Sequence, residues 1–254
     1  MNVPLREQTV VVTGGGRGYG EQMAKALAKE GAAITVASRT ESECMKVAEE
    51  ICIEGGRAIG VQTDIGQLVD VQAMVEATLE AFDRIDVLIN NAADPGAVGP
   101  VAATGEEVWL KTLDVNLIGS LRCVRAVLPD MMARMSGQIV NLSSGTARLG
   151  YRHIRSLSYT TSKHALEGFS SGLAVELEPY GIRVNAFTPG LAQTRFLSNM
   201  PEGYLRGLKC QTPEHVGPAI IYLLTSDFPS GERFEALPWL EEEGLLEQFS
   251  YVHD

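Results

Sequence analysis

Thr13-Gly14-Gly15-Gly16-Arg17-Gly18-Tyr19-Gly20 is the stretch that decides the fold of this 254-residue chain. It follows the apolar, β-branched run Thr9–Val12 and precedes the amphipathic segment Glu21–Glu30, so it joins a predicted strand to a predicted helix. Glycines let the backbone turn tightly and approach a pyrophosphate, whose charge then lies at the amides of the helix N-terminus. The context therefore predicts a dinucleotide-binding loop rather than a merely flexible turn.

The rest of the chain repeats this alternation of strand and helix, which is typical of parallel strands joined by crossover helices. The predicted strands are Thr9–Val12, Ala33–Ala37, Ala58–Gln62, Asp86–Ile89, Gln138–Leu142 and Ile182–Phe187. The predicted helices are Glu21–Glu30, Glu41–Glu54, Leu68–Phe82, Glu106–Met135, Ser158–Tyr180 and Glu214–Thr225. Because nearly all the strands are continuous apolar runs, both faces of the sheet must be covered. We expect residues 1–254 to form a single α/β domain with a doubly wound (Rossmann) parallel sheet.

The charge of the chain is unevenly distributed along its length. Overall, 21 basic and 32 acidic residues give a net charge of −11, which disfavours sequence-independent binding to nucleic acid or to an anionic membrane. Residues 226–254 hold eight of the acidic residues and one basic residue, Arg233. We therefore treat residues 226–254 as an atypical acidic C-terminal segment attached to a nearly neutral body.

The sequence also indicates the compartment in which the protein is expected and the state of its cysteines. No apolar run reaches the length of a membrane span, and the first strand begins too near Met1 for a secretory signal peptide to precede it. The four cysteines are too few and too scattered for a disulfide framework, and they lack metal-ligand spacing beside the four histidines. We expect a cytoplasmic protein with reduced thiols, no metal site and no membrane partner.

Tyr159 and Lys163 stand four residues apart in a predicted helix, so their side chains share one helical face. A free tyrosine has a pKa of about 10, and a nearby ammonium group favours its phenolate. Ser143 and Ser144 follow the predicted strand that ends at Leu142. Open α/β sheets bind ligands at the carboxyl edge of their strands, so these groups predict acid–base chemistry at that edge.

Several ordered motifs make the chain resemble a known family, the classical short-chain dehydrogenases/reductases. The glycine-rich loop matches the family spacing T-G-x3-G-x-G, and the resemblance covers about residues 5–225. Its other motifs are Asp64, Asn90-Asn91-Ala92-Ala93, Asn116, Ser144, Tyr159-Thr160-Thr161-Ser162-Lys163, Pro189-Gly190 and Thr194. The resemblance implies an oxidoreductase that interconverts a carbonyl and a secondary alcohol by hydride transfer with a nicotinamide cofactor.

The resemblance also implies a role for each matching residue. Tyr159 protonates the carbonyl oxygen or removes the alcohol proton, while Lys163 lowers the tyrosine pKa and holds the ribose of the nicotinamide nucleotide. Ser144, favoured over Ser143 by its position, hydrogen-bonds the reacting oxygen, and Asn116 anchors a water that links the lysine to solvent. The expected cofactor-binding residues are Gly14, Gly16, Arg17, Gly18, Tyr19, Gly20, Arg39, Asp64, Ile65, Asn91, Ala92, Tyr159, Lys163, Pro189, Gly190 and Thr194.

The end of the second strand bears on which cofactor is used. An acid there binds the ribose 2′-hydroxyl of NAD, whereas a nearby arginine accommodates the 2′-phosphate of NADP. The chain reads Ser38-Arg39-Thr40, with no acid before Glu41. Arg39 and Arg17 therefore favour NADP(H) over NAD(H), and an NAD-linked alcohol dehydrogenase is the alternative. A dinucleotide-sensing binding protein is a further alternative, but pure binding needs no proton donor.

Two loops have two interpretations each. Arg148, Arg152, His153 and Arg155 form a basic cluster that either attracts an anionic substrate or lies at the surface or a subunit contact. Residues 191–212 are either a substrate lid ordered by the cofactor or a packed connector.

The chain departs from the family pattern in three places. Ala93 replaces the last glycine of Asn-Asn-Ala-Gly, Tyr19 replaces an aliphatic residue, and the C-terminus lacks a Val-Asp-Gly-Gly-like turn. Instead we expect an edge strand in Gly231–Leu237 and a short acidic helix at Leu240–Phe249. The family often builds a subunit interface around its last strand. The departure therefore weakens the expectation of a homotetramer relative to a homodimer through the fourth and fifth helices.

Overall fold

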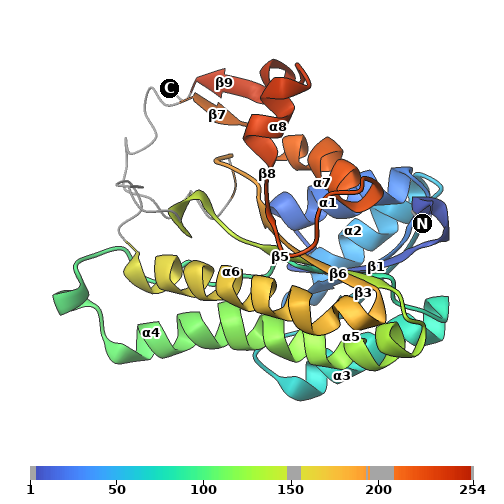
Figure 1. Cartoon of the computed structure of the whole chain (residues 1–254), viewed down its shortest axis with the longest axis horizontal. Coiled ribbons are helices and arrows are strands. Elements are labelled where there is room, and N and C mark those ends of the chain that lie inside the picture. The colour runs from blue at the N-terminus through green and yellow to red at the C-terminus, as the bar shows by residue number, and fades with distance from the viewer. Residues whose placement is uncertain (1–3, 148–155, 193, 195–208, 253–254) are drawn as a thin grey trace.

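The computed structural model describes residues 4–147, 156–192, 194 and 209–252. Seven strands form one sheet in the order β3-β2-β1-β4-β5-β6-β8, with every neighbouring pair parallel (Figure 1). The strands are β1 Thr9–Thr13, β2 Ala33–Ser38, β3 Arg57–Gln62, β4 Val87–Asn90, β5 Gly137–Leu142, β6 Ile182–Thr188 and β8 Arg233–Glu235. The predicted doubly wound parallel sheet is confirmed.

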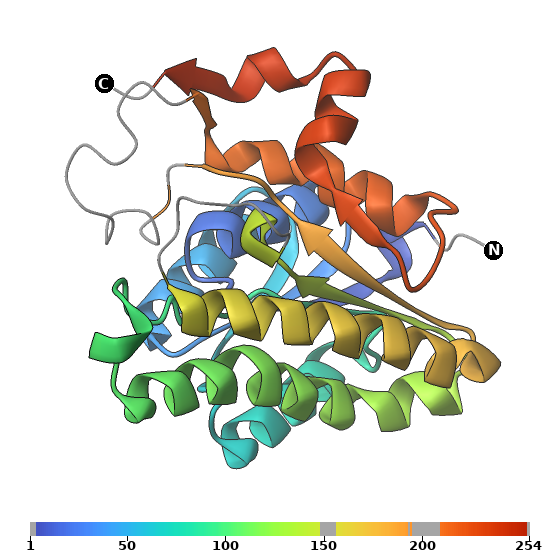
Figure 2. The same ribbon diagram turned by 60° about the vertical axis from the view of Figure 1, so that its left-hand side comes forward.

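Helices cover both faces of this sheet, as Figures 1 and 2 show. One layer contains α1 Gly18–Lys29, α2 Glu41–Ile53 and α7 Val216–Thr225, and the other contains α3 Leu68–Phe82, α4 Glu106–Leu113, α5 Ser120–Ala133 and α6 Leu157–Leu177. Successive side chains of a strand point to opposite faces. Val10 and Val12 pack in the core beneath α1, whereas Val11 packs in the core beneath α5. This two-sided burial explains why the strand sequences are continuously apolar.

The strand order reverses between β1 and β4, and this reversal positions the site. β1 pairs with β2 on one side and with β4 on the other. The chain leaves β1 and β4 toward opposite layers, which opens a crevice at the carboxyl edge of the sheet. Thr13 and Asn90 are the paired last residues of the two strands, so the glycine-rich loop and the loop after β4 meet there.

The helix predicted over Glu106–Met135 is interrupted. It consists of α4, a π-helical turn η3 at Asp114–Gly119, and α5. A π-helical turn adds one residue to the helical turn, which re-aims the side chains within it. Gly119 lies where an added Cβ would come within 2.8 Å of the Ile65 side chain, so η3 packs closely against the loop after β3.

The C-terminal segment differs from the prediction in part. β8 pairs with β6 as the expected edge strand. The helix predicted at Leu240–Phe249 is wrong in its bounds, because α8 spans Ala236–Glu242 and is followed by the 3₁₀ turn η8, Leu246–Phe249. Pro238 does not prevent this helix, since proline is tolerated in a first turn. Beyond η8, β9 Ser250–Val252 pairs antiparallel with β7 Lys209–Gln211.

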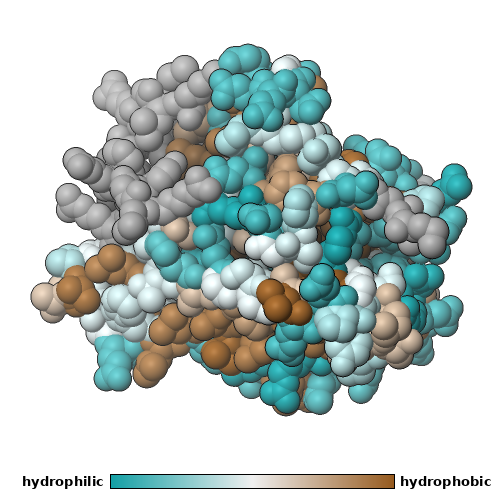
Figure 3. Space-filling model, in the orientation of Figure 1, coloured by the Kyte–Doolittle hydropathy of each residue, from teal (hydrophilic) through white to brown (hydrophobic). Residues whose placement is uncertain are grey.

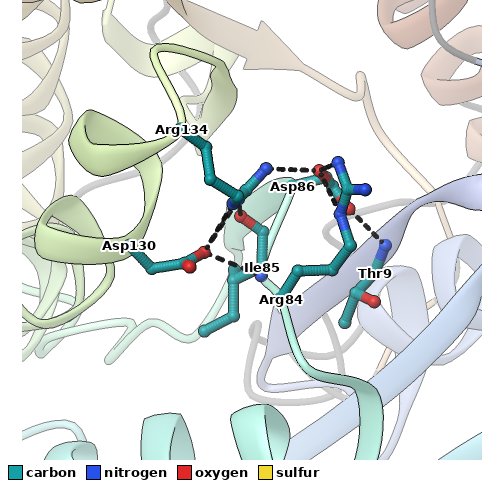
Figure 4. Close-up of polar contacts among 6 residues, drawn as sticks. All are labelled: Thr9, Arg84, Ile85, Asp86, Asp130 and Arg134. Carbon is teal, nitrogen blue, oxygen red and sulfur yellow. Dashed lines mark hydrogen bonds and ion pairs between the residues drawn. The ribbon is translucent and has the colours of Figure 1, made fainter.

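A cluster of ion pairs lies at the amino edge of the sheet, opposite the crevice. It comprises Thr9, Arg84, Ile85, Asp86, Asp130 and Arg134, and we call it the amino-edge cluster (Figure 4). The buried Asp86 carboxylate accepts hydrogen bonds from the Thr9 amide at 2.9 Å, Arg84 at 2.6 Å and Arg134 at 2.9 Å. Arg134 also donates to Asp130 at 2.8 Å. The cluster thus joins β1, the start of β4 and the end of α5.

Two further expectations concern the described part of the chain. None of its helices has the length and apolarity needed to cross a membrane. Cys44, Cys52, Cys123 and Cys210 are all free thiols, and only Cys52 of these is exposed.

Candidate active site

A cleft of about 560 Å³ occupies the carboxyl edge of the sheet at the strand-order reversal. Most of the residues expected from sequence line it: Gly14, Gly16, Arg17, Gly18, Tyr19, Arg39, Asp64, Ile65, Asn91, Ala92, Ser144, Tyr159, Lys163, Pro189, Gly190 and Thr194. Gly20 and Asn116 are the expected residues that do not line it. Sequence reasoning missed other lining residues, including Ser38, Thr63 and Thr146, which are small polar side chains without a distinctive spacing.

Gly20 acts behind the cleft, by letting the first turn of α1 pack against the loop. A Cβ at Gly20 would lie 2.3 Å from the Gly14 carbonyl oxygen and 2.5 Å from Asn91 Nδ2. Asn91 Nδ2 in turn donates to the carbonyl oxygens of Thr13 at 2.9 Å and Gly14 at 3.0 Å. Asn91 thus fixes the glycine-rich loop to the end of β4.

Two arginines lie at the end of the cleft formed by α1, β2 and α2. Arg17 Nη1 forms an ion pair with Glu43 Oε1 at 3.3 Å. Arg39 is exposed, and among the described residues its guanidinium has no hydrogen bond or ion pair. At this end of the cleft, the Arg39 guanidinium is therefore available to a ligand. The charge of Arg17 is partly neutralised by Glu43.

Tyr159, Lys163 and Ser144 come together at the middle of the cleft. The Ser144 side chain acts on the Tyr159 hydroxyl as a hydrogen-bonding neighbour that lowers its pKa. Ser144 Oγ is also 3.3 Å from the Thr146 amide and 3.1 Å from Thr146 Oγ1. Lys163 Nζ lies 5.6 Å from the centre of the Tyr159 ring and donates to the Leu142 carbonyl oxygen at 2.6 Å. Tyr159 and Lys163 are both buried.

Burial dominates the acid–base properties of the Tyr159 and Lys163 pair. It raises the pKa of Tyr159 to about 12, and the hydrogen bond from Ser144 offsets this only in part. Burial also lowers the pKa of Lys163 to about 8. The expectation that the lysine brings the tyrosine pKa toward neutrality is therefore not met by the protein groups alone. Desolvation of the phenolate outweighs an ammonium group that is directed at a backbone carbonyl.

Asn116 lies in the π-helical turn η3 and joins the loop after β4 to α6. Its Oδ1 accepts a hydrogen bond from the Asp94 amide at 2.7 Å, and its Nδ2 donates to Ser162 Oγ at 2.8 Å. Ser162 Oγ donates to the Tyr159 carbonyl oxygen at 2.7 Å. The Asn116 side chain therefore supports the first turns of α6, which carries the tyrosine.

Pro189 and Gly190, after β6, are held from two directions. Tyr19 Oη donates to the Gly190 carbonyl oxygen at 3.0 Å. His215, which is fully buried, has Nε2 at 2.5 Å from the Pro189 carbonyl oxygen and Nδ1 at 2.7 Å from that of Thr212. Its ring meets the Tyr19 ring edge to face, with centroids 5.7 Å apart. Tyr19, a departure from the family pattern, thus links α1 directly to this loop, and sequence reasoning missed His215.

Of the two loops discussed from sequence, one falls wholly and the other partly outside the described residues. The basic cluster of Arg148, Arg152, His153 and Arg155 lies there entirely, as does residue 193 and the range 195–208 of the expected lid.

Known proteins are similar to this chain in sequence and in fold. Residues 8–204 match the family model for short chain dehydrogenases. The short-chain reductase protein NovJ of Streptomyces niveus is 39% identical over 197 residues, covering 78% of this chain and 74% of that protein. The 3-oxoacyl-(acyl-carrier-protein) reductase of Synechocystis is 33% identical over 226 residues, covering 87% and 90%. The crystal structure of NAD⁺-bound xylitol dehydrogenase has a TM-score of 0.81 at 25% identity, covering 90% and 97%.

Proposed function

The chain belongs to the short-chain dehydrogenase/reductase family, and from that premise we propose that it reduces a carbonyl to a secondary alcohol with NADPH, using Tyr159 as the proton donor. Membership of this family identifies the chain as an oxidoreductase that acts on CH–OH or C=O groups with a nicotinamide dinucleotide. One observation carries the proposal: Ser144, Tyr159 and Lys163 line the same cleft, with Tyr159 buried and Lys163 Nζ 5.6 Å from the centre of its ring.

The residues present fit a bound dinucleotide. Gly14 and Gly18 line the cleft at the N-terminus of α1, and their φ of +63° and +57° are values that residues with a side chain rarely adopt. We propose that this loop holds the pyrophosphate, with Asp64, Ile65, Asn91 and Ala92 at the adenosine side. Pro189, Gly190 and Thr194 are proposed to hold the nicotinamide end. The dinucleotide itself supplies the hydride, so the protein has to bind, orient and move a proton.

The protonation states of the site support reduction. With a pKa of about 12, Tyr159 is a neutral phenol at pH 7 and has a proton to give. Ser144 is proposed to hold the carbonyl oxygen beside the Tyr159 hydroxyl. Lys163, with a pKa of about 8, is mostly charged at pH 7, and we propose that its ammonium binds the ribose hydroxyls. We propose that Asn116 positions α6 and anchors the water that links Lys163 to solvent.

The preference for NADPH rests on Arg39, with Arg17 beside it. We expect Arg39→Asp to raise the KM for NADPH by at least about tenfold, because it removes the exposed cation and repels a 2′-phosphate. The KM for NADH should change much less. Initial rates with each cofactor measure both values, and Arg6→Asp, at an exposed arginine away from the cleft, is the matched control. Equal effects on the two cofactors would contradict the preference.

An NAD-linked alcohol dehydrogenase is the second candidate. Glu43 pairs with Arg17 at the same end of the cleft, and a carboxylate there favours a ribose hydroxyl over a phosphate. The similar xylitol dehydrogenase is described as NAD⁺-bound. Oxidation of NADPH and NADH should therefore be followed against a carbonyl panel that includes a 3-oxoacyl thioester and a ketose, because the relatives' names include both classes of chemistry. Absence of turnover with every carbonyl would favour a dinucleotide-sensing protein.

We also propose that the chain forms a homodimer through the two predicted helices Glu106–Met135 and Ser158–Tyr180, which are α4, η3 and α5 and then α6 in the structure. Figure 3 shows hydrophobic side chains gathered over the lower part of the molecule, where Figure 1 places these helices. Leu110 and Ile118, on α4 and η3, are 60% and 38% exposed. Large exposed apolar surfaces mark interaction sites.

Light scattering tests the homodimer. We expect a mass near twice 27.4 kDa for the unmodified chain and a monomer mass for Ile118→Lys. Ile53→Lys, at an exposed isoleucine on α2, is the control that should leave the dimer intact. A monomeric unmodified chain would refute the dimer, and a fourfold mass would indicate the homotetramer.

A further inference from the structure

The acidic C-terminal segment places an arginine, Arg233, beside the turn that follows β5. In β8, Phe234 packs in the core between the sheet and α7, with its ring centroid 5.8 Å from that of Phe187. Neighbouring strand residues point to opposite faces, so Arg233 and Glu235 point away from α7. This places Arg233 beside α6 and the end of β5, where its side chain is 12% exposed.

Arg233 contacts the backbone of the proposed catalytic serine. Its Nη2 donates to the Ser144 carbonyl oxygen at 3.3 Å. Its Nη1 forms an ion pair with Glu167 of α6, and its Nε lies 3.0 Å from Glu235 Oε1. Glu167 Oε1 also accepts a hydrogen bond from Ser143 Oγ. A single ion pair therefore holds both serines, one by its side chain and the other by its carbonyl.

The same helix face already carries the other groups of the site. Glu167 is one helical turn beyond Lys163, which is one turn beyond Tyr159. Lys163 holds the carbonyl oxygen of Leu142, so the last residue of β5 and the two serines after it are each fixed by a charged side chain. Hydrogen bonds to charged groups are about twice as strong as neutral ones. This turn is thus held more firmly than backbone pairing alone would hold it.

We propose that Arg233 and Glu167 are positioning residues, which set the Ser143-Ser144 turn so that the Ser144 hydroxyl meets Tyr159. The inference rests on the proposed function, because it takes Ser144 to work with Tyr159 on the reacting oxygen. It also gives the acidic segment a part in catalysis, since β8 brings Arg233 to the turn. Neither residue touches the substrate.

A double-mutant cycle tests this inference with NADPH and an accepted carbonyl. Arg233→Met should lower kcat by about tenfold, corresponding to the loss of one charge-assisted hydrogen bond, with the KM for NADPH unchanged. Arg233→Lys should recover part of that loss. It keeps the positive charge but lacks the planar guanidinium that donates to Glu167 and to the Ser144 carbonyl oxygen at once. In a Ser144→Ala background, Arg233→Met should reduce kcat by less than about twofold, since its effect passes through the serine.

Several outcomes separate this inference from its premise. If Ser144→Ala alone keeps full activity, the proposed role of the serine fails. If Ser144→Ala is impaired but Arg233→Met is not, or if their effects multiply, the positioning role is overturned and the proposed function stands. Arg57→Met, at an exposed arginine on β3, is the control for loss of an arginine. Should Arg233→Met not fold, Glu167→Gln removes the ion pair with little change of shape and is expected to show the same kcat loss and the same cycle.

Discussion

Tyr159→Phe should lower turnover by about 10³-fold or more while the protein still binds NADPH, because it removes the proposed proton donor but keeps the buried ring. General acid catalysis contributes about 10²- to 10⁴-fold, and here the lost hydroxyl is also the group whose pKa the Ser144 side chain lowers. Steady-state rates give kcat, and the fluorescence of bound NADPH gives its dissociation constant.

Tyr180→Phe is the matched control for Tyr159→Phe. Tyr180 lies in the turn after α6 and does not line the cleft. Removal of its hydroxyl should therefore leave kcat unchanged. Activity of Tyr159→Phe close to that of the unmodified protein would refute the assigned acid. A loss of NADPH binding equal to the loss of kcat would instead indicate a damaged cofactor site.

The largest expected effect on stability comes from Asp86→Ala, which should lower the free energy of unfolding by about 3–5 kcal/mol. Asp86 is buried and is the shared acceptor of the amino-edge cluster, so its removal leaves Arg134 and the Thr9 amide without this partner (Figure 4). Whole domains of this kind are stable by only about 5–15 kcal/mol. Urea denaturation followed by circular dichroism measures the change.

Glu7→Ala is the control for Asp86→Ala. Glu7 pairs with Arg6 at 3.9 Å on the surface, where such pairs contribute about 0–1 kcal/mol. Similar losses for the two variants would contradict the assigned role of the cluster.

The amino-edge cluster also predicts the response to acid. Burial opposes ionisation of Asp130, but hydrogen bonds from Arg134 and the Ile85 amide outweigh it and hold the pKa of Asp130 below its ordinary value of 3.8. A carboxyl with a lowered pKa adds stability at pH values above its unfolded pKa, and this stability is lost as the pH falls through the folded pKa. The contribution should therefore be complete at neutral pH and decline progressively as the pH falls below about 4, and Asp130→Asn should lack it.

Much of the architecture follows from local sequence. The predicted strand Thr9–Val12 is found as Thr9–Thr13, because β-branched residues buried on both faces leave a continuous apolar run. Glycines at Gly14 and Gly20 indicated the cleft because close packing at those positions excludes any side chain. Most cleft-lining motifs were predictable because they follow a strand whose end is fixed by the sheet, whereas Tyr159 and Lys163 were predictable from their spacing in a helix.

Other features depend on contacts that local sequence does not encode. The π-helical turn at Asp114–Gly119 was missed because one extra residue in a turn hardly changes the apolar spacing of a long helix. The raised pKa of Tyr159 depends on how deeply the phenol is buried and on the acceptor of the Lys163 ammonium group, which is the Leu142 carbonyl oxygen. Arg233 looked like one basic residue in an acidic tail, and its partners come from two distant elements.

The contact between Arg233 and the Ser144 carbonyl spans 89 residues of chain. During synthesis on the ribosome, Ser144, Tyr159 and Lys163 emerge long before β8, so the turn after β5 is first exposed without its arginine. Forming this late pairing closes a long loop, which is slow compared with the formation of local helix. Full activity should therefore appear only after β8 has joined the sheet, so a growing chain carries its proposed acid–base residues well before the turn beside them is set.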